Sequence, residues 1–78
     1  MSLVNKKYIV LIDNGSTTEK LKTLCYMRTI RKSGKSFCEF AHTCSEGKHF
    51  TTKASATKCR DRLREGGYSA WVDTFYVI

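Results

Sequence analysis

The last third of the chain constrains its fold most, because a helix pattern, a glycine pair and a strand pattern follow one another there without a break. The apolar side chains that recur at the spacing of one helix face are Ala56, Cys59 and Leu63. Thr51 or Thr52 can cap the start of this helix, and Gly66-Gly67 can end it, since glycine readily takes the left-handed conformation that closes helices. We therefore predict a helix from about residue 53 to residue 65.

Two segments have the pattern of buried strands. Residues 6–13 (KKYIVLID) and 68–78 (YSAWVDTFYVI) are rich in β-branched and aromatic residues, and both are apolar on each of their two faces. We expect both to lie inside a sheet. A chain of 78 residues supports only one hydrophobic core. The predicted fold is therefore a single α+β domain spanning residues 1–78, with a mainly antiparallel sheet of four to five strands.

Residues 17–33 allow two interpretations. Ser16 and Glu19 form the capping pattern that starts a helix near residue 17, but the apolar periodicity of such a helix fails after Cys25. Alternatively, residues 24–31 and 36–43 pair as a hairpin around the turn sequence KSGK. The facing pairs are then Ile30 with Phe37, Arg28 with Glu39 and Met27 with Phe40. We prefer a short helix that leads into this hairpin, and one longer helix ending before Gly34 is the alternative.

The charge of the chain indicates the sign of its partner. Fourteen Lys and Arg against seven Asp and Glu give a net charge of +7, which attracts a nucleic acid or an acidic protein surface. No apolar run approaches the roughly 18 residues that span a membrane, and no export signal is recognisable, so we expect no membrane partner. The four cysteines then suit reduced thiols in a cytoplasm.

One face of the predicted helix gathers positive side chains. Lys53, Arg60 and Arg64 form a ridge beside the buried stripe, whereas Lys58 and Arg62 lie on the other flank. A solvated helix face with the same charges is the structural alternative. The residues that we predict to bind nucleic acid are Lys53, Arg60, Arg64, Arg28 and Lys35 for phosphates, and Trp71 or Tyr26 for base stacking.

Catalytic and metal chemistry receive little support. No two carboxylates are convincingly placed as a pair, so we expect a non-enzymatic protein without a cofactor, although Cys25 and His42 could form a nucleophile pair in the hairpin. The hairpin also brings four possible zinc ligands to one face: Cys25, His42, Cys44 and His49. Without a CxxC spacing, half-buried cysteines and surface histidines explain these residues better than a metal site.

Residues 49–72 (HFTTKASATKCRDRLREGGYSAWV) resemble the second half of a SPOR domain, with a strand, a Thr-rich helix start and a Gly-Tyr turn into a strand. This resemblance implies a βαββαβ fold that binds peptidoglycan glycan strands in a periplasm. The layout is also similar to that of integrase arm-type DNA-binding domains, whose sheet enters a groove. Two further hypotheses are a phage or mobile-element accessory protein that targets an acidic host surface, and a homodimer paired through an edge strand.

Overall fold

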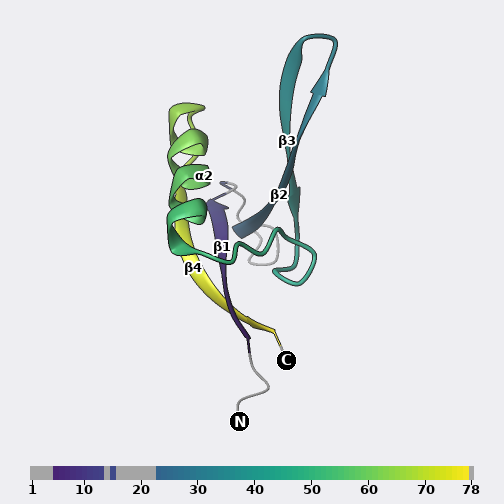
Figure 1. Ribbon diagram of the computed structural model, residues 1–78. Helices are drawn as coiled ribbons and strands as arrows, with labels where there is room; N and C mark the ends of the chain where they lie inside the picture. Colours follow the sequence, from purple (N-terminus) through teal and green to yellow (C-terminus); the bar gives the residue numbers. More distant parts are fainter. Residues whose placement is uncertain (1–4, 14, 16–22, 78) are drawn as a thin grey trace.

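A computed structural model describes residues 5–13, 15 and 23–77 of the chain. Its elements are β1 (Asn5–Asp13), β2 (Thr23–Lys32), β3 (Lys35–Ala41), α2 (Lys53–Glu65) and β4 (Ala70–Val77). The four strands form one antiparallel sheet in the order β3-β2-β1-β4, and α2 packs on β1 and β4 (Figure 1). This architecture confirms the predicted small α+β domain. No helix in the described parts of the chain has the length and apolar character needed to cross a bilayer.

The hydrophobic core is centred on β1, which has four consecutive buried residues from Ile9 to Ile12. Because alternate side chains of a strand point to opposite faces, these residues supply both sides of the sheet. Val10 and Ile12 pack under α2 with the buried residues Ala56, Leu63 and Ala70. Ile9 and Leu11 form a smaller cluster with Cys25. Burial on both faces confirms that β1 is an interior strand.

Strand β4 lies at the edge of the sheet, so the prediction of an interior position is wrong. It pairs with β1 from Ala70 to Val77 and is the terminal strand in the sheet order. Its large side chains are also partly solvent-exposed, with 37% of Trp71 and 57% of Tyr76 accessible. The physical reason is that Trp and Tyr combine an apolar body with a polar group, which lets them occupy a half-wet surface.

The hairpin interpretation of the middle of the chain is confirmed for β2 and β3. Ser33 and Gly34 form its two-residue turn, with φ values of 54° and 75°. Two consecutive positive φ angles match the right-handed twist of the flanking strands, and they explain why a small residue and a glycine occupy this turn. The possible helix starting near residue 17 lies outside the described residues.

A β-bulge at Met27 shifts the register of this hairpin. Ile30 pairs with Phe37 and Arg28 with Glu39, as expected, but Tyr26 rather than Met27 pairs with Phe40. The prediction for Met27 is therefore wrong, because this residue is the extra one that a bulge inserts into one strand. Beyond the bulge, Cys25 faces Ala41 instead of His42.

The helix α2 has the predicted bounds and caps. Thr52 is its N-cap, and the Thr52 hydroxyl accepts a hydrogen bond from the backbone N–H of Ser55 at 3.3 Å. At the other end, the N–H of Gly66 donates to the Arg62 carbonyl at 3.1 Å, and Gly67 has a φ of 94°. Ahead of the helix, Phe50 makes an isolated antiparallel β-bridge to Tyr8.

Candidate functional site

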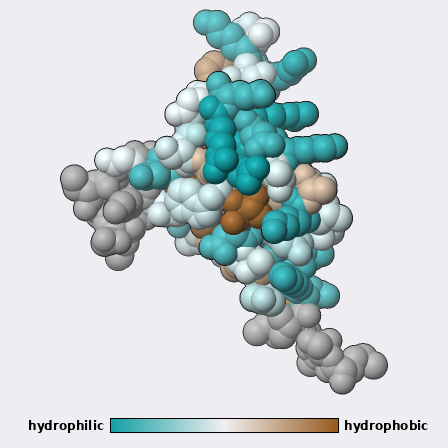
Figure 2. All heavy atoms as spheres, turned by 90° about the vertical axis from the view of Figure 1, so that its left-hand side faces the viewer, coloured by the Kyte–Doolittle hydropathy of each residue, from teal (hydrophilic) through white to brown (hydrophobic). Residues whose placement is uncertain are grey.

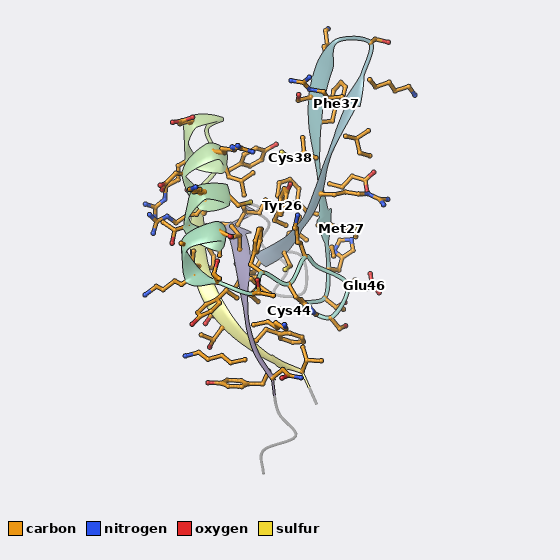
Figure 3. All side chains as sticks on the ribbon, in the orientation of Figure 1. Tyr26, Met27, Phe37, Cys38, Cys44 and Glu46 are labelled. Atoms are coloured by element: carbon orange, nitrogen blue, oxygen red, sulfur yellow. The ribbon has the colours of Figure 1, made fainter. Side chains whose placement is uncertain are left out.

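The β2–β3 hairpin and α2 face one another across a cleft. Two hollows that share lining residues make up this cleft, with volumes of about 290 Å³ and 530 Å³. Figure 3 shows Tyr26 and Cys38 on the side of the hairpin that faces α2. Both hollows are lined by Tyr26, Thr29, Cys38, Lys48 and Arg62. We call this region the basic cleft, after the five cationic residues that line it: Arg28, Arg31, Lys48, Lys58 and Arg62.

The bulge at Met27 determines which hairpin side chains face the cleft. In a regular strand, Tyr26 and Thr29 would lie on opposite faces, because they are three residues apart. The extra residue, Met27, places Tyr26 and Thr29 on the same face. The Tyr26 hydroxyl and Thr29 Oγ1 are 2.8 Å apart there. Arg31, two residues after Thr29, then lies on that face as well. The bulge therefore brings an aromatic ring and a guanidinium to the same wall.

The opposite wall comes from one flank of α2. Lys58 and Arg62 are one helical turn apart, so they lie on the same side of the helix, next to Cys59 and the buried Leu63. The spacing of these two cations was evident in the sequence. What the sequence did not reveal is that this flank faces the hairpin, because the position of the hairpin depends on tertiary packing.

The connection from β3 to α2 supplies the remaining cation, Lys48. Its backbone N–H donates to the Tyr26 carbonyl at 2.8 Å, and its ammonium nitrogen lies 5.3 Å from the centre of the Phe50 ring. The preceding residue, Gly47, allows this close approach, because a Cβ at that position would overlap Cys25 Sγ. Lys48 is thus anchored to β2 by its backbone, whereas its charged group reaches the cleft.

No carboxylate of the residues that the structure describes lines either hollow of the basic cleft. Arg28 has a partner in Glu39, with 2.9 Å between Nε and Oε2, but the Arg28 side chain is 64% exposed and such pairs are weak. For Arg31, Lys48, Lys58 and Arg62, no acidic group among the described residues is within ion-pair distance. Their like charges therefore reinforce one another across the cleft and favour a bound anion.

The floor of the cleft is uncharged and partly aromatic. The Tyr26 and Phe50 rings are stacked at 23°, with 6.4 Å between their centroids. Burial raises the pKa of the Cys59 thiol to about 11, and the neighbouring Cys38 thiol adds to this effect, whereas Lys48 and Arg62 oppose it. Cys59 is therefore a neutral thiol near pH 7. The cleft combines an apolar floor with a cationic rim.

The structure brings only two of the predicted nucleic-acid-binding residues, Tyr26 and Arg28, to this cleft. Arg60 pairs with Asp61, with 2.9 Å between Nη2 and Oδ1, and Arg64 Nε donates to the Ala70 carbonyl at 2.9 Å. Figure 2 views the molecule from the α2 side and shows this surface covered mostly by hydrophilic side chains. The predicted ridge therefore has one internal ion pair and one arginine tied to the backbone.

The other predicted residues lie elsewhere on the molecule. Lys53 lines a separate hollow that also contains Lys6 and Asp73. Lys35 directly follows the turn of the hairpin. Trp71 pairs with Leu11 on the sheet face that points away from α2, so it is not beside Tyr26. The residues that sequence reasoning missed are Arg31, Lys48, Lys58 and Arg62.

The four possible zinc ligands do not converge. Cys25 and Cys44 lie together, and burial, followed by the neighbouring Cys44, raises the pKa of the Cys25 thiol to about 12. His49 Nε2 instead lies 2.8 Å from the Cys44 carbonyl oxygen, and His42 is exposed. Across the described ranges, no three or more His, Cys, Asp or Glu side chains are grouped to hold a metal ion. The register also separates the hypothetical Cys25–His42 pair.

Comparison of the chain with protein families, with characterised proteins and with solved structures finds no match. The geometry and charge of the basic cleft are therefore what indicates a function.

Proposed function

We propose that this protein is a non-enzymatic module that binds nucleic acid through the basic cleft. The observation that carries the proposal is the group of five cationic residues that line the cleft, with no carboxylate among its described lining residues. A surface of this kind attracts phosphates over long range and binds them by release of their counterions. The net charge of +7 adds to the attraction, and a cytoplasmic location with reduced thiols belongs to the same proposal.

The basic cleft is a better candidate than the predicted ridge on α2. Arg60 already has a carboxylate partner, and Arg64 is engaged by a backbone carbonyl, so an anion would have to compete with existing interactions there. In the cleft, Lys58 and Arg62 repel one another at the spacing of one helical turn, and a phosphate between them would relieve that repulsion. Each cation of the cleft would therefore contribute more binding free energy than a cation of the ridge.

The proposal is tested by fluorescence anisotropy with labelled random oligonucleotides, both single- and double-stranded, over a series of salt concentrations. We expect binding at micromolar protein in low salt, and a steep, linear fall of the logarithm of affinity with the logarithm of salt. Absence of any association at micromolar protein in low salt would refute the proposal.

An acidic protein surface could exploit the same charges, and a pull-down from nuclease-treated cell lysate distinguishes it from nucleic acid. Retention of a specific acidic protein after nuclease treatment would favour a protein partner, as in a phage-like accessory protein.

Light scattering tests the separate prediction of a homodimer, for which the edge strand β4 offers unpaired backbone groups.

A further inference from the structure

The basic cleft has different chemistry at its floor and at its rim. The inner hollow, of about 290 Å³, is floored by the aromatic rings of Tyr26 and Phe50 together with Cys59 and Leu63. Lys48, Lys58 and Arg62 line the same hollow, and Arg31 lines the adjoining one. An occupant that matches this arrangement has a flat, uncharged part of limited size, with negative charges directly beside it.

We infer that the inner hollow receives one unstacked nucleobase of a single-stranded nucleic acid, while the flanking phosphates contact the cationic rim. This inference rests on the proposed function and adds to it a preference for single strands. Bases stack on aromatic side chains of single-strand-binding proteins largely irrespective of sequence, because every base has a π face. Tyr26 and Phe50 line the inner hollow, and because their rings already stack on one another with 6.4 Å between centroids, a base would stack on the outer side of this pair.

The size of the inner hollow favours one base over a paired duplex. Its volume is near the lower end of the roughly 300–1,000 Å³ found for small-molecule sites, which suits a single planar group. A base within a duplex is stacked and paired, so it cannot reach the floor unless it is first extruded, and extrusion costs free energy. Duplex DNA would therefore contact the rim alone.

The hydroxyl groups in the cleft predict weak discrimination among bases. Thr29 Oγ1 is already 2.8 Å from the Tyr26 hydroxyl, and the Ser55 hydroxyl accepts a hydrogen bond from the Thr52 hydroxyl at 2.9 Å. Among the described residues that line this hollow, none has an amide or carboxylate side chain, and its one guanidinium, Arg62, is assigned to the phosphates. Stacking rather than hydrogen-bond recognition would dominate, so oligonucleotides of different sequence should bind similarly.

The test compares three ligands at one salt concentration: a single-stranded 12-mer, the same 12-mer with abasic sites at every internal position, and its duplex. Base–aromatic stacking typically changes affinity by about 5- to 150-fold per base. We expect the intact single strand to bind at least about 5-fold tighter than the other two ligands. Equal binding of all three, or tighter binding of the duplex, would overturn the inference but leave the proposed function intact. Binding of none would refute the proposed function itself.

A blocked cleft gives an independent measurement. Ser55→Trp places a large ring at the cleft from the exposed first turn of α2, whereas Ala54→Trp adds the same ring at an exposed neighbouring position that does not line the cleft. We expect Ser55→Trp to remove most of the advantage of the intact strand over the abasic one, and Ala54→Trp to retain it. An unchanged advantage in a folded Ser55→Trp protein would place the base elsewhere and overturn the inference.

Discussion

Two arginines on α2 allow the proposed site to be separated from the ridge that the sequence predicts. Arg62 lines the basic cleft, whereas Arg60, two residues earlier on the same helix, is paired with Asp61. Replacing either one with glutamine lowers the net charge by the same single unit, from +7 to +6. A difference between Arg62→Gln and Arg60→Gln therefore reports position and not total charge.

The expected dependence of affinity on salt concentration follows from the number of cations in the cleft that have no carboxylate partner among the described residues. With four phosphates neutralised by Arg31, Lys48, Lys58 and Arg62, the logarithm of affinity for a single strand should fall with a slope of about −2.8 against the logarithm of salt, at about −0.7 per phosphate. Affinity would then fall about 50-fold between 50 and 200 mM salt. Arg62→Gln should reduce the slope to about −2.1 and this fall to roughly 20-fold.

The assay is fluorescence anisotropy of one labelled 12-mer at five salt concentrations, with the wild type, Arg62→Gln and Arg60→Gln measured in parallel. Circular dichroism melting confirms that both variants are folded. We expect Arg60→Gln to retain the wild-type slope, because its charge is already balanced by Asp61. If Arg60→Gln lowers the slope as much as Arg62→Gln or more, phosphates bind at the ridge and the argument for the cleft is refuted.

Three further predictions concern stability, each measured by urea unfolding. Gly47→Ala should lower the free energy of unfolding by about 1–3 kcal/mol, because its Cβ overlaps Cys25 Sγ, and a Cys25→Ala background should recover most of this loss. Thr52→Ala should cost about 1 kcal/mol by removing the N-cap acceptor, whereas Thr52→Ser should retain it. The Cys25 thiol has a pKa raised from 9.0 to about 12, so the folded state keeps a proton that the unfolded chain loses above pH 9. Between pH 9 and 12, the free energy of unfolding of the wild type should therefore fall more steeply with pH than that of Cys25→Ala, by up to about 1.4 kcal/mol per pH unit. Below pH 8, the free energies of unfolding of the two proteins should change with pH in parallel.

The sequence predicted the parts of the fold that local interactions determine. Helix α2 has the predicted bounds because Thr52 and Gly66-Gly67 act within one turn of its ends. The interior position of β1 was also predictable, since burial on both faces leaves an unbroken apolar run. The same criterion failed for β4, where Trp71 and Tyr76 are apolar by composition but tolerate water.

The basic cleft was harder to predict because it depends on contacts between distant segments. Met27 has no sequence signature of a bulge, and the register on either side of it is fixed by partners on β3. One of these is Phe40, whose ring also packs edge-on against Tyr26 at 6.3 Å. A regular hairpin would turn Arg31 away from the wall that it shares with Tyr26. The two α2 cations were recognised as a pair, but nothing local indicated which element they would face.

The bulge has a consequence for how this hairpin tolerates changes in length. Removing Met27 would leave Tyr26 next to Arg28, and the side chains beyond would keep their present sides, because the deleted residue is the unpaired one. Deleting a neighbour such as Thr29 would instead exchange the two sides of β2 from that point to the turn. Single-residue deletions along one strand would thus differ sharply in outcome, and Met27 marks the position where the hairpin can shorten without rearranging its charge.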